Sequence, residues 1–571
     1  MLRQLRFSFP SSSQFKRFGS ILSKKEKVIL YLAIILFTGS LVAWTINYYI
    51  SSTRKCPHIG GEYTEGIVGQ PLYINPILAK LNEADSALCK LLFSSLLTYD
   101  NNGNLVNDIA DRYEISDDGK TYTFYIKQGV RWHDKTELNT KDIEFTVKLI
   151  QDKAYKSTLR GDWQDISINV IDDHTISFSI PNPYSPFLNK ATFGILPKHI
   201  FEKVPVENFL LCEFNLKPVG SGSFVFSHYE QDEEDNLISY QLLANKDYYG
   251  KQPFLEKINF NFYSDEQALI DAYNKKEVNG FSVISYENIH TFEQKKGTLV
   301  HSMKIPRYFA VFFNKTRSVP LADSNVRKAL QLATNRNEII EQVFSKYATP
   351  VYSPILASFS EFDSSKSAEH FPFDTEKSEQ KLDESGWKRN DDGIREKDGQ
   401  KLEISLITTQ YPELVRTAEI IKAQWEKVGV IVNVSNLELS DIQQNFIKPR
   451  EYQSILFGQE YFGNDPDPYH FWHSSRKKDP GRNIAVYNNE DVDKLLEESR
   501  NTNDSTERKD KFRQFEEKIL EDAPAVFLYS PSYIYIVNSK IKGIDTTAII
   551  NSSYRFSNIQ HWYIKTIRTK K

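Results

Sequence analysis

The sequence predicts an α/β protein of more than one lobe, preceded by one membrane-spanning helix. Two observations carry this prediction: a single long apolar run near the N-terminus, and strand-like and helix-like segments that alternate along the rest of the chain. The 571 residues, 40% hydrophobic and 26% charged, are typical of a globular protein with several cores. Because the two kinds of segment are interleaved, we expect lobes built from non-contiguous pieces.

The apolar run covers residues 28–50 and contains no charged side chain. As a helix it reaches roughly 35 Å, enough to cross a hydrocarbon layer of about 30 Å. Seven basic residues and one acidic residue precede it, whereas only Arg54 and Lys55 follow it closely, so the N-terminus should stay in the cytoplasm. We expect a cytoplasmic tail at 1–27, a transmembrane helix at 28–50 and a tether at 51–58.

A cleaved signal peptide is the alternative to a retained anchor. The apolar run exceeds the roughly 7–15 residues of a signal peptide's central region, and no A-x-A-like site follows it. Cys56 suggests a lipid-modified cysteine, but residues 52–55 are not the small apolar residues that such a site needs. We predict retention, with everything after Ile50 outside the cytoplasm.

Charge and cysteine content exclude other classes. The formal net charge is −4; leaving out the six net positive charges of residues 1–27 and the two of Arg54 and Lys55 gives −12 for residues 56–571. This argues against nucleic-acid binding, which needs a basic surface. The cysteines form no disulfide framework and no metal-ligand spacing, and whether Cys89 and Cys212 pair stays open. The three cysteines are Cys56, Cys89 and Cys212.

Strand-like alternation is clear at three places. Residues 121–126 follow a turn at 116–119, and the runs 167–171 and 175–180 form a hairpin-like pair around Asp172-Asp173-His174. These segments predict a strand and a hairpin in the first half of the chain.

The sequence also predicts two units in which a helix leads into a strand. Residues 418–428 carry a helical stripe, end at Gly429 and lead into the strand 430–434. A second stripe stops before Pro524, and the strand 525–529 follows. The first stripe consists of Ile421, Trp425 and Val428, and the second of Phe512, Phe515, Ile519 and Leu520.

Residues 95–146 contain a series of short motifs in a fixed order. They are SLLTYD at 95–100, Gly103, DIA at 108–110, YEISDDGKTYTF at 113–124, GVRWHD at 129–134 and Asp142-Ile143. The series resembles the signature of the family 5 extracellular solute-binding proteins, the oligopeptide- and dipeptide-binding receptors of ABC importers.

The likeness continues in order from about residue 60 to about residue 543. Further matching segments are GSGSF at 220–224, NKDYY at 245–249 with Pro253, VRKAL at 326–330 with Ala333 and Arg336, Gly386-Trp387, Asp465-Pro466 and Tyr487-Asn488-Asn489. The resemblance implies a periplasmic-binding-protein type II fold, in which two α/β lobes and an extra subdomain close around a ligand like a hinged clamp. We expect lobe I from 59–97, 216–312 and 523–571, the extra subdomain from 98–215, and lobe II from 313–522.

The best candidate ligand wall is the segment 455–466. In the family that it resembles, the corresponding stretch pairs its backbone with an extended peptide, which suits a receptor for many sequences. A glycine at 458 allows close approach; the plainer interpretation is a buried strand that leads into a proline-bounded loop. The ligand-binding residues that we predict are Gly458, Gln459, Glu460, Tyr461, Phe462, Asp465 and Trp472.

One position departs from the family pattern. An Asp three residues before the Asp-Pro pair holds the ligand's α-ammonium in peptide receptors of this family, whereas this chain has Phe462. An enclosed ammonium without a counter-charge is strongly disfavoured. Either Glu460 or Asp465 substitutes, or the ligand is not bound by a free amine. The aromatic side chains of this segment, Tyr461, Phe462, Tyr469, Phe471 and Trp472, line a roomy pocket or fill the core.

Signs of catalysis and metal binding are weak. There is no H-E-x-x-H, G-x-S-x-G, P-loop or helix-opening G-x-G-x-x-G. His470 and His473 lie three residues apart but lack a third ligand. We expect Trp132 and His133 to shape the fold rather than to touch ligand.

The sequence therefore predicts a monomeric receptor without cofactor, held by its N-terminal helix on the outer face of the cytoplasmic membrane. Its partners would be a peptide and an ABC permease, not nucleic acid. Two alternatives stay open: a receptor of the same fold for a metal chelate or an oligosaccharide, and a surface sensor or chaperone-like domain without a transporter.

Overall fold

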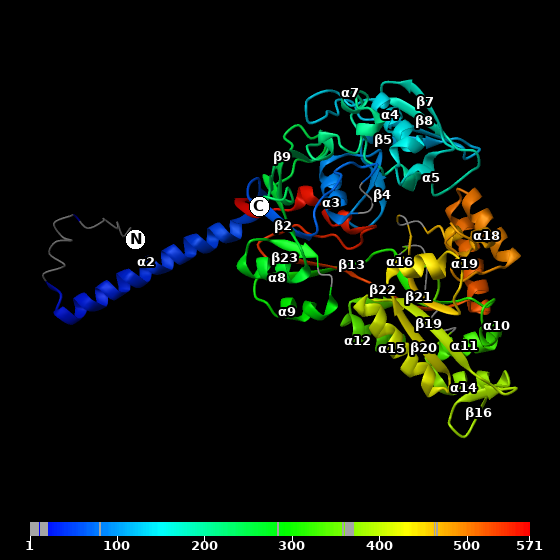
Figure 1. Cartoon of the computed structure of the whole chain (residues 1–571). Helices are drawn as coiled ribbons and strands as arrows, with labels where there is room; N and C mark the ends of the chain where they lie inside the picture. The colour runs from blue at the N-terminus through cyan, green and yellow to red at the C-terminus, as the bar shows by residue number, and fades with distance from the viewer. Residues whose placement is uncertain are drawn as a thin grey trace, which may run out of the picture. The chain divides into compact units, whose positions relative to one another are not determined.

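The structure is a computed structural model (Figure 1). It describes residues 11, 21–78, 82–282, 285–356, 359, 371–461, 463 and 466–571. The chain divides into two compact units. The terminal unit comprises the described residues up to Ile59 together with Lys565–Lys571, and the body comprises residues 60–564.

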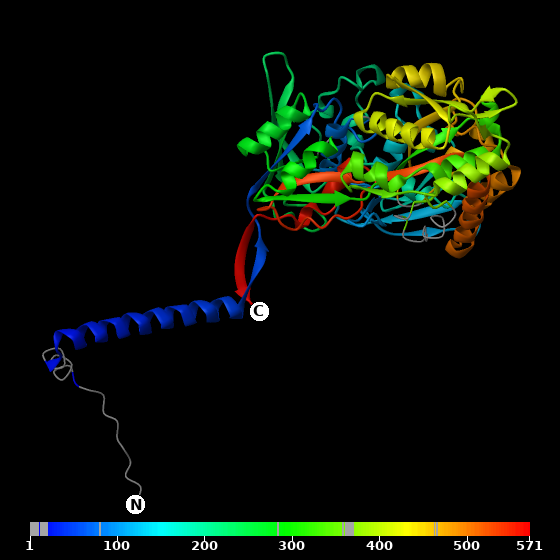
Figure 2. The same cartoon turned by 90° about the horizontal axis from the view of Figure 1, so that it is seen from below.

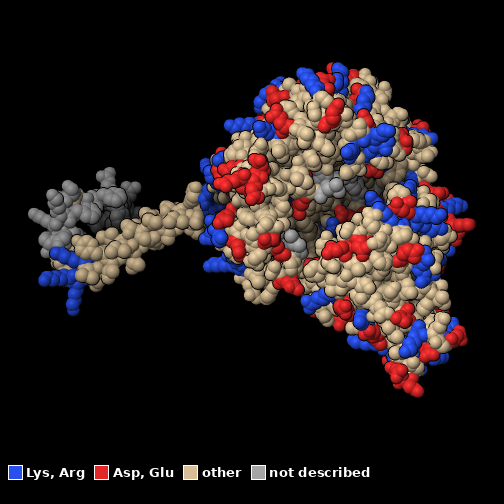
Figure 3. Space-filling model, in the orientation of Figure 1, with Lys and Arg blue, Asp and Glu red and all other residues tan. Residues whose placement is uncertain are grey.

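The terminal unit begins with helix α2, Lys24–Ser52. Ser23 caps it, because its Oγ accepts from the Glu26 amide and the Glu26 carboxylate accepts from the Ser23 amide. None of its residues is buried, and Figure 3 shows an uncharged helix surface with basic side chains at the N-terminal end. Among the described helices, α2 alone is long and apolar enough to cross a membrane. Its composition fits a membrane anchor or a signal sequence.

A two-stranded ribbon follows α2 directly. Strand β1, Thr53–His58, pairs antiparallel with the C-terminal strand β24, Lys565–Lys570, from Thr53↔Lys570 to His58↔Lys565. Figure 2 shows β24 returning beside β1 to the end of α2. Most of the segment predicted as a tether is thus a strand. No local pattern reveals this, because the strand's partner lies at the other end of the chain.

The first sheet of the body has seven strands of mixed direction. β2 is parallel to both of its neighbours, and the other pairs are antiparallel. Helices α8, Glu266–Lys275, and α9, Ile289–Glu293, cover one face, while α3, Glu83–Leu92, packs with the core of the other. In sheet order the strands are β13 Thr298–Met303, β23 Tyr533–Asn538, β12 Gly280–Ser282, β2 Glu62–Val68, β11 Lys257–Tyr263, β10 Leu237–Ala244 and β9 Phe224–Gln231.

The second sheet has six strands with helices on both faces. In sheet order they are β15 Ala348–Pro350, β22 Ala525–Pro531, β14 Arg307–Phe313, β21 Ser454–Glu460, β19 Glu403–Thr409 and β20 Ile431–Leu437. Alternate residues of β14 enter opposite cores, as the period of a strand requires. One core includes α11 Ser324–Ala333, α12 Arg336–Phe344, α14 Thr375–Glu384 and α15 Pro412–Lys427; the other includes α17 Tyr469–Trp472, α18 Glu490–Asn501 and α19 Ser505–Asp522.

The third sheet is antiparallel and packs with helix α4, Thr140–Gln151. In order its strands are β5 Ala110–Ile115, β6 Thr121–Ile126, β8 Thr175–Ser179 and β7 Ser167–Asp172. Alternate residues of β6 are buried, and β7 and β8 form the predicted hairpin. The strand and hairpin predictions are confirmed here.

Short elements complete the body. The remaining strands are β3 Leu97–Tyr99, β4 Leu105–Asn107, β16 Lys388–Arg389, β17 Arg395–Lys397 and β18 Gln400–Lys401. The remaining helical turns are η2 Lys153–Tyr155, α5 Arg160–Trp163, α6 Phe187–Lys190, α7 Lys198–Phe201, η3 Val206–Asn208, η4 Glu213–Asn215, η5 Tyr286–Asn288, α10 Val319–Ala322, α16 Leu439–Asp441, η6 Ile442–Ile447, η7 Ser474–Arg476, η8 Ser552–Phe556 and η9 Ile559–His561.

Both predicted helix-to-strand units are confirmed. α15 leads into β20, and it starts earlier than predicted because Pro412 occupies a favourable first-turn position. α19 leads into β22, and its buried residues are the predicted stripe of Phe512, Phe515, Ile519 and Leu520.

The chain passes between the first and second sheets twice, and both passages are short. Residues 304–306 join β13 to β14, and residue 532 joins β22 to β23. The lobe boundaries predicted at 312 and 523 lie six and nine residues from these crossings. β14 and β22, which the prediction placed almost wholly in lobe I, belong to the second sheet. A proline lies at each crossing: Pro306 directly precedes β14, and Pro531 is the last residue of β22.

Candidate ligand-binding site

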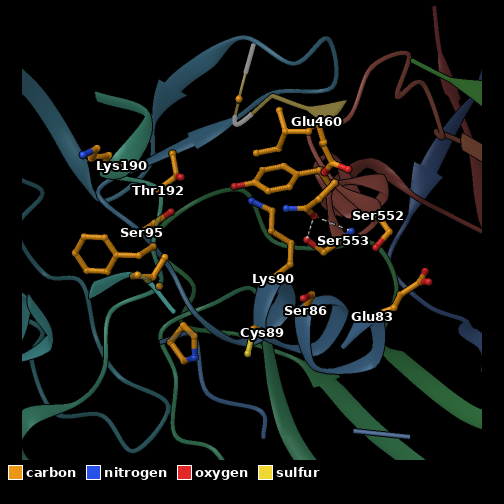
Figure 4. Close-up of a pocket in the computed structure, with 18 of the residues that line it drawn as sticks. Glu83, Ser86, Cys89, Lys90, Ser95, Lys190, Thr192, Glu460, Ser552 and Ser553 are labelled. Carbon is orange, nitrogen blue, oxygen red and sulfur yellow. Dashed lines mark hydrogen bonds between the residues drawn. The ribbon is translucent and has the colours of Figure 1, made fainter. Parts of the chain in front are cut away.

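A cavity of about 660 Å³ lies in the body between helix α3 and the end of strand β21 (Figure 4). This volume is within the range of small-molecule sites, about 300–1,000 Å³. Figure 3 shows a hollow in the middle of the body, with acidic and basic side chains around it. The cavity has a helix wall, formed by α3 and η8, and a strand wall, formed by the ends of β14 and β21.

The helix wall presents polar side chains from one face of α3. Glu83, Ser86 and Lys90 line the cavity together with Cys89, while the alanines and leucines of the same helix are buried behind them. The helix starts cleanly because the Asn82 side chain accepts from the Ala84 amide at 2.8 Å. Cys89 and Cys212 are free thiols, which answers the question that the sequence left open.

A glycine-rich loop holds the C-terminal end of α3. The Gly222 amide donates to the Leu92 carbonyl at 2.8 Å, and a Cβ on Gly220 would collide with that carbonyl oxygen. His133 pins the loop: its Nδ1 accepts from the Gly220 amide at 3.1 Å and its Nε2 donates to the Gly222 carbonyl at 3.2 Å. Burial lowers the pKa of His133 to about 4, so the ring is neutral at pH 7. The prediction that His133 shapes the fold agrees with this geometry.

A buried ionic network lies behind the other end of α3. Arg555, at the end of η8, donates from Nε to Glu65 of β2 at 2.9 Å and reaches Glu83 of α3 at 3.3 Å. The Arg555 and Glu65 side chains are fully buried. Tyr63 and Tyr535 also donate to Glu65, the latter at 2.6 Å. Burial raises the pKa of the Glu65 carboxyl against the opposing pull of Arg555.

Lys90 is the distinctive charge of the helix wall. Its ammonium donates to the Thr98 hydroxyl at 2.6 Å and lies 4.2 Å from the centre of the Tyr554 ring. It makes no ion pair with any carboxylate that the structure describes, whereas Lys190 across the cavity pairs with Asp162 at 3.6 Å. Burial lowers the pKa of Lys90 to about 8, against the opposing effect of Asp108. An anionic group of a ligand would complete this arrangement.

The strand wall carries charges that already neutralise each other. Glu460, the last residue of β21, accepts from Arg307 Nε of β14 at 2.7 Å, and both side chains line the cavity half-exposed. Tyr461 follows, buried, with its hydroxyl donating to the Pro354 carbonyl at 2.8 Å. A ligand amine would therefore compete with Arg307 for Glu460.

Among the described residues, one edge of β21 has no strand partner at the cavity end. On one side β14 pairs with all seven residues from Ser454 to Glu460. On the other side the pairing with β19 covers Ser454 and Ile455 only, in the part of the chain that the structure describes. The main chain of residues 457–460 is thus available to an added strand on that side.

The predicted site residues fall into four groups. Glu460 and Tyr461 line the cavity. Gly458 and Gln459 lie within β21: Gly458 makes room for the Phe309 ring, and Tyr308 donates to the buried Gln459 side chain. Trp472 is fully buried among Phe312, Tyr487 and Phe527, in the core under the second sheet. Phe462 and Asp465 lie outside the described residues.

Among the residues that the structure describes, no group of three or more His, Cys, Asp or Glu side chains could hold a metal ion. His470 approaches Asp467, and His473 is hydrogen-bonded to Ser475 and Glu497 at 2.8 and 3.2 Å. These contacts account for both histidines as parts of the fold.

Sequence reasoning missed the helix wall and the serines of η8. Ser552 and Ser553 line the cavity, and the Asn551 side chain orients Ser553 by accepting from its amide and hydroxyl (Figure 4). A signal for α3 existed: Asn82 is a preferred N-cap, and polar residues recur at 83, 86 and 90, one face of a helix. Nothing local links this face to η8, which lies more than 450 residues further along the chain.

Comparison with known proteins gives the same architecture. The family described as bacterial extracellular solute-binding proteins, family 5 Middle, matches residues 104–483. The oligopeptide-binding protein AppA of Bacillus subtilis is 28% identical over 526 residues, covering 90% of this chain and 94% of AppA. The solved structure of AppA in complex with a nonapeptide has a TM-score of 0.68 and 27% identity, covering 89% of this chain and 100% of that chain.

The ABC transporter substrate binding protein CtaP of Listeria monocytogenes is also similar, with a TM-score of 0.76 and 26% identity. The match covers 89% of this chain and 100% of CtaP. These findings confirm the type II periplasmic-binding-protein fold that the resemblance implied. The family consists of substrate-binding receptors rather than enzymes. This chain belongs to the bacterial extracellular solute-binding proteins of family 5.

Proposed function

We propose that this chain is a membrane-retained receptor that captures peptides in the cavity between α3 and β21 and delivers them to the permease of an ABC importer. The observation that carries the proposal is a ligand-sized cavity between two sheets in a chain of a solute-binding family. In the described part of the chain, two short crossings join these sheets. Receptors of this kind close by a hinge, and short paired linkers suit that motion.

The proposed ligand is a peptide because of the relatives and the strand wall. AppA is named for oligopeptide binding and was solved with a nonapeptide. The free edge of β21 offers main-chain groups to an extended peptide, whatever its sequence. We propose contacts from Gly458, Gln459, Glu460, Tyr461, Phe462 and Asp465, with Trp472 supporting the strand from the core.

The charges of the cavity suggest how the peptide is oriented. Lys90 would receive a carboxylate, since it has no described counter-charge. Glu460 is already paired with Arg307, so a free amine is not the main anchor on the strand wall. Binding through the carboxyl end would fit a chain that has Phe462 where family members use an aspartate for the amine.

Retention of the N-terminal helix is also part of the proposal. Processing at Cys56 would remove Thr53, Arg54 and Lys55 and so half of the ribbon with β24. The Cys56 thiol is itself engaged, 3.1 Å from the Thr569 hydroxyl. A retained anchor keeps the receptor at a high effective concentration near its transporter. In this proposal the receptor is a monomer, needs no cofactor and catalyses nothing.

Mass spectrometry of the ligands released on denaturing the purified full-length chain tests the proposal. We expect short peptides with free carboxyl ends. Metal chelates or sugars would favour the alternative receptor of the same fold, and an empty, ligand-inert protein would favour a sensor or chaperone-like role. Intact mass from the membrane fraction should include residues 1–27; a shortened chain would contradict retention.

A further inference from the structure

The ribbon of β1 and β24 places a group of cations at the outer end of α2. Its register puts Lys55 directly opposite Arg568, with Lys570 two residues further on the same face of the ribbon. Residues 51–58 and 564–571 include six lysines and arginines and no acidic side chain. They are Arg54, Lys55, Lys565, Arg568, Lys570 and Lys571.

This arrangement is unfavourable by itself. Like charges directly opposite each other in a sheet are destabilising. None of the six cations makes an ion pair with a carboxylate in the described part of the chain. Arg568 Nη1 donates to the Thr53 hydroxyl at 2.9 Å and contacts the Ile50 carbonyl at 3.4 Å, which accounts for Arg568 but leaves Lys55 and Lys570 exposed.

The depth of these cations follows from their distance along the chain from α2. Trp44, Tyr48 and Tyr49 occupy its last turns, where aromatic side chains favour the membrane interface. β1 starts at the next residue after the helix, and a strand rises about 3.4 Å per residue, so Lys55 and Arg568 lie at most about 10 Å beyond the helix end. The headgroup layer is about 5–8 Å thick on each side of a bilayer.

We propose that the ribbon face formed by Lys55, Arg568 and Lys570 binds the headgroups of anionic phospholipids in the outer leaflet. The headgroup phosphates supply the negative charge that the ribbon lacks and separate the opposed cations. Bound lipid holds the ribbon, and with it both ends of the extracytoplasmic chain, against the membrane surface. This inference rests on the proposed retention of α2.

The test uses the full chain with Cys89 and Cys212 replaced by alanine, and a bimane fluorophore on Cys56, within the ribbon. The protein is placed in phosphatidylcholine vesicles with the same small mole fraction of either doxyl-labelled phosphatidylglycerol or doxyl-labelled phosphatidylcholine. We expect quenching by the anionic lipid to be roughly threefold higher or more, and the difference to shrink in 1 M salt.

Substitutions separate lipid binding from a structural role. K55S/K570S should bring the quenching ratio close to one, while K565S at the far end of the ribbon should leave it unchanged. K55E places a glutamate opposite Arg568, which stabilises the ribbon but removes a lipid contact, so the ratio should fall although the ribbon is intact. If K55E and K55S/K570S keep the wild-type ratio, the proposal is overturned.

The lipid preference of the ribbon and the retention of the membrane anchor can be tested separately. Equal quenching of the wild-type chain by both lipids would overturn the lipid preference alone. Quenching by neither lipid would show that the end of α2 is not at a bilayer, and would overturn the anchor and the headgroup site together.

Discussion

The two walls of the cavity are held in place by different means. The strand wall rests on main-chain hydrogen bonds, since β21 pairs along its whole length with β14 and in part with β19. The helix wall packs on the core through the apolar face of α3, and a few buried polar side chains hold its two ends: Arg555 and Glu65 behind one end, and His133 with its glycine loop at the other. Side-chain substitutions should therefore disturb the helix wall far more than the strand wall.

The largest effect is expected at Glu65. Glu65→Ala should lower the free energy of unfolding by about 3–5 kcal/mol, because it leaves the fully buried Arg555 without its nearest carboxylate. Glu62→Ala is the matched control on the same strand: it breaks an exposed pair with Lys257 and should cost less than about 1 kcal/mol. Urea unfolding followed by circular dichroism measures both, and equal losses would contradict the side-chain support of the helix wall.

His133 should make the free energy of unfolding depend on pH. Its pKa is about 4 in the folded state and about 6.5 when unfolded, so the unfolded chain takes up the proton first as pH falls. The contribution of neutral His133 to the free energy of unfolding is complete above pH 6.5 and is lost as pH falls from 6.5 to 4. This loss is roughly 3 kcal/mol at most. His133→Gln should reduce the dependence of the free energy of unfolding on pH between pH 6.5 and 4. His470, with a pKa also about 4, should keep its share in the variant, and an unchanged slope would refute the role given to His133.

Lys90 tests the chemistry of the helix wall. Lys90→Met should weaken the binding of a peptide with a free carboxyl end by roughly 10- to 150-fold, the range of one charge-assisted hydrogen bond. Lys190→Met, which removes a lysine already paired with Asp162, should cost much less. Amidation of the peptide's carboxyl end should abolish the difference between wild type and Lys90→Met. Calorimetry provides the affinities.

The proposed contact between Lys90 and the peptide's carboxylate should also make the binding affinity depend on pH. The Lys90 ammonium loses its proton as pH rises through about 8, so affinity for the carboxylate should be full below pH 8 and fall above it. An ordinary lysine would hold affinity to about pH 10. A flat profile up to pH 10 would exclude Lys90 as the carboxylate contact.

The smallest effect is expected on the strand wall. Glu460→Gln should change stability by less than about 1 kcal/mol, because the Arg307–Glu460 pair is half-exposed. Its effect on binding affinity should be less than about fivefold, and the same for free-amine and N-acetylated peptides. A large loss confined to free-amine peptides would instead make Glu460 the counter-charge of the ligand's ammonium.

The sequence predicted what is local. β6, the β7–β8 hairpin, α15 and α19 follow from the spacing of apolar residues, and the fold class followed from the order of short motifs. The sequence could not predict contacts between distant segments, such as the pairing of β1 with β24 and the ion pair of Arg555 with Glu65. The crossings at 304–306 and 532 lie six and nine residues from the predicted lobe boundaries, because β14 and β22 are as apolar as the strands of either lobe.

Photo-crosslinking of a bound peptide shows whether the ligand lies between the helix wall and the strand wall. A peptide with a free carboxyl end and a central benzoylphenylalanine is irradiated with the full-length chain, and the adducts are mapped by mass spectrometry. Enclosure between the two walls predicts adducts on both, within residues 83–92 or 552–554 and within residues 457–463. Adducts on one wall alone, or on a surface away from the cavity, would contradict it.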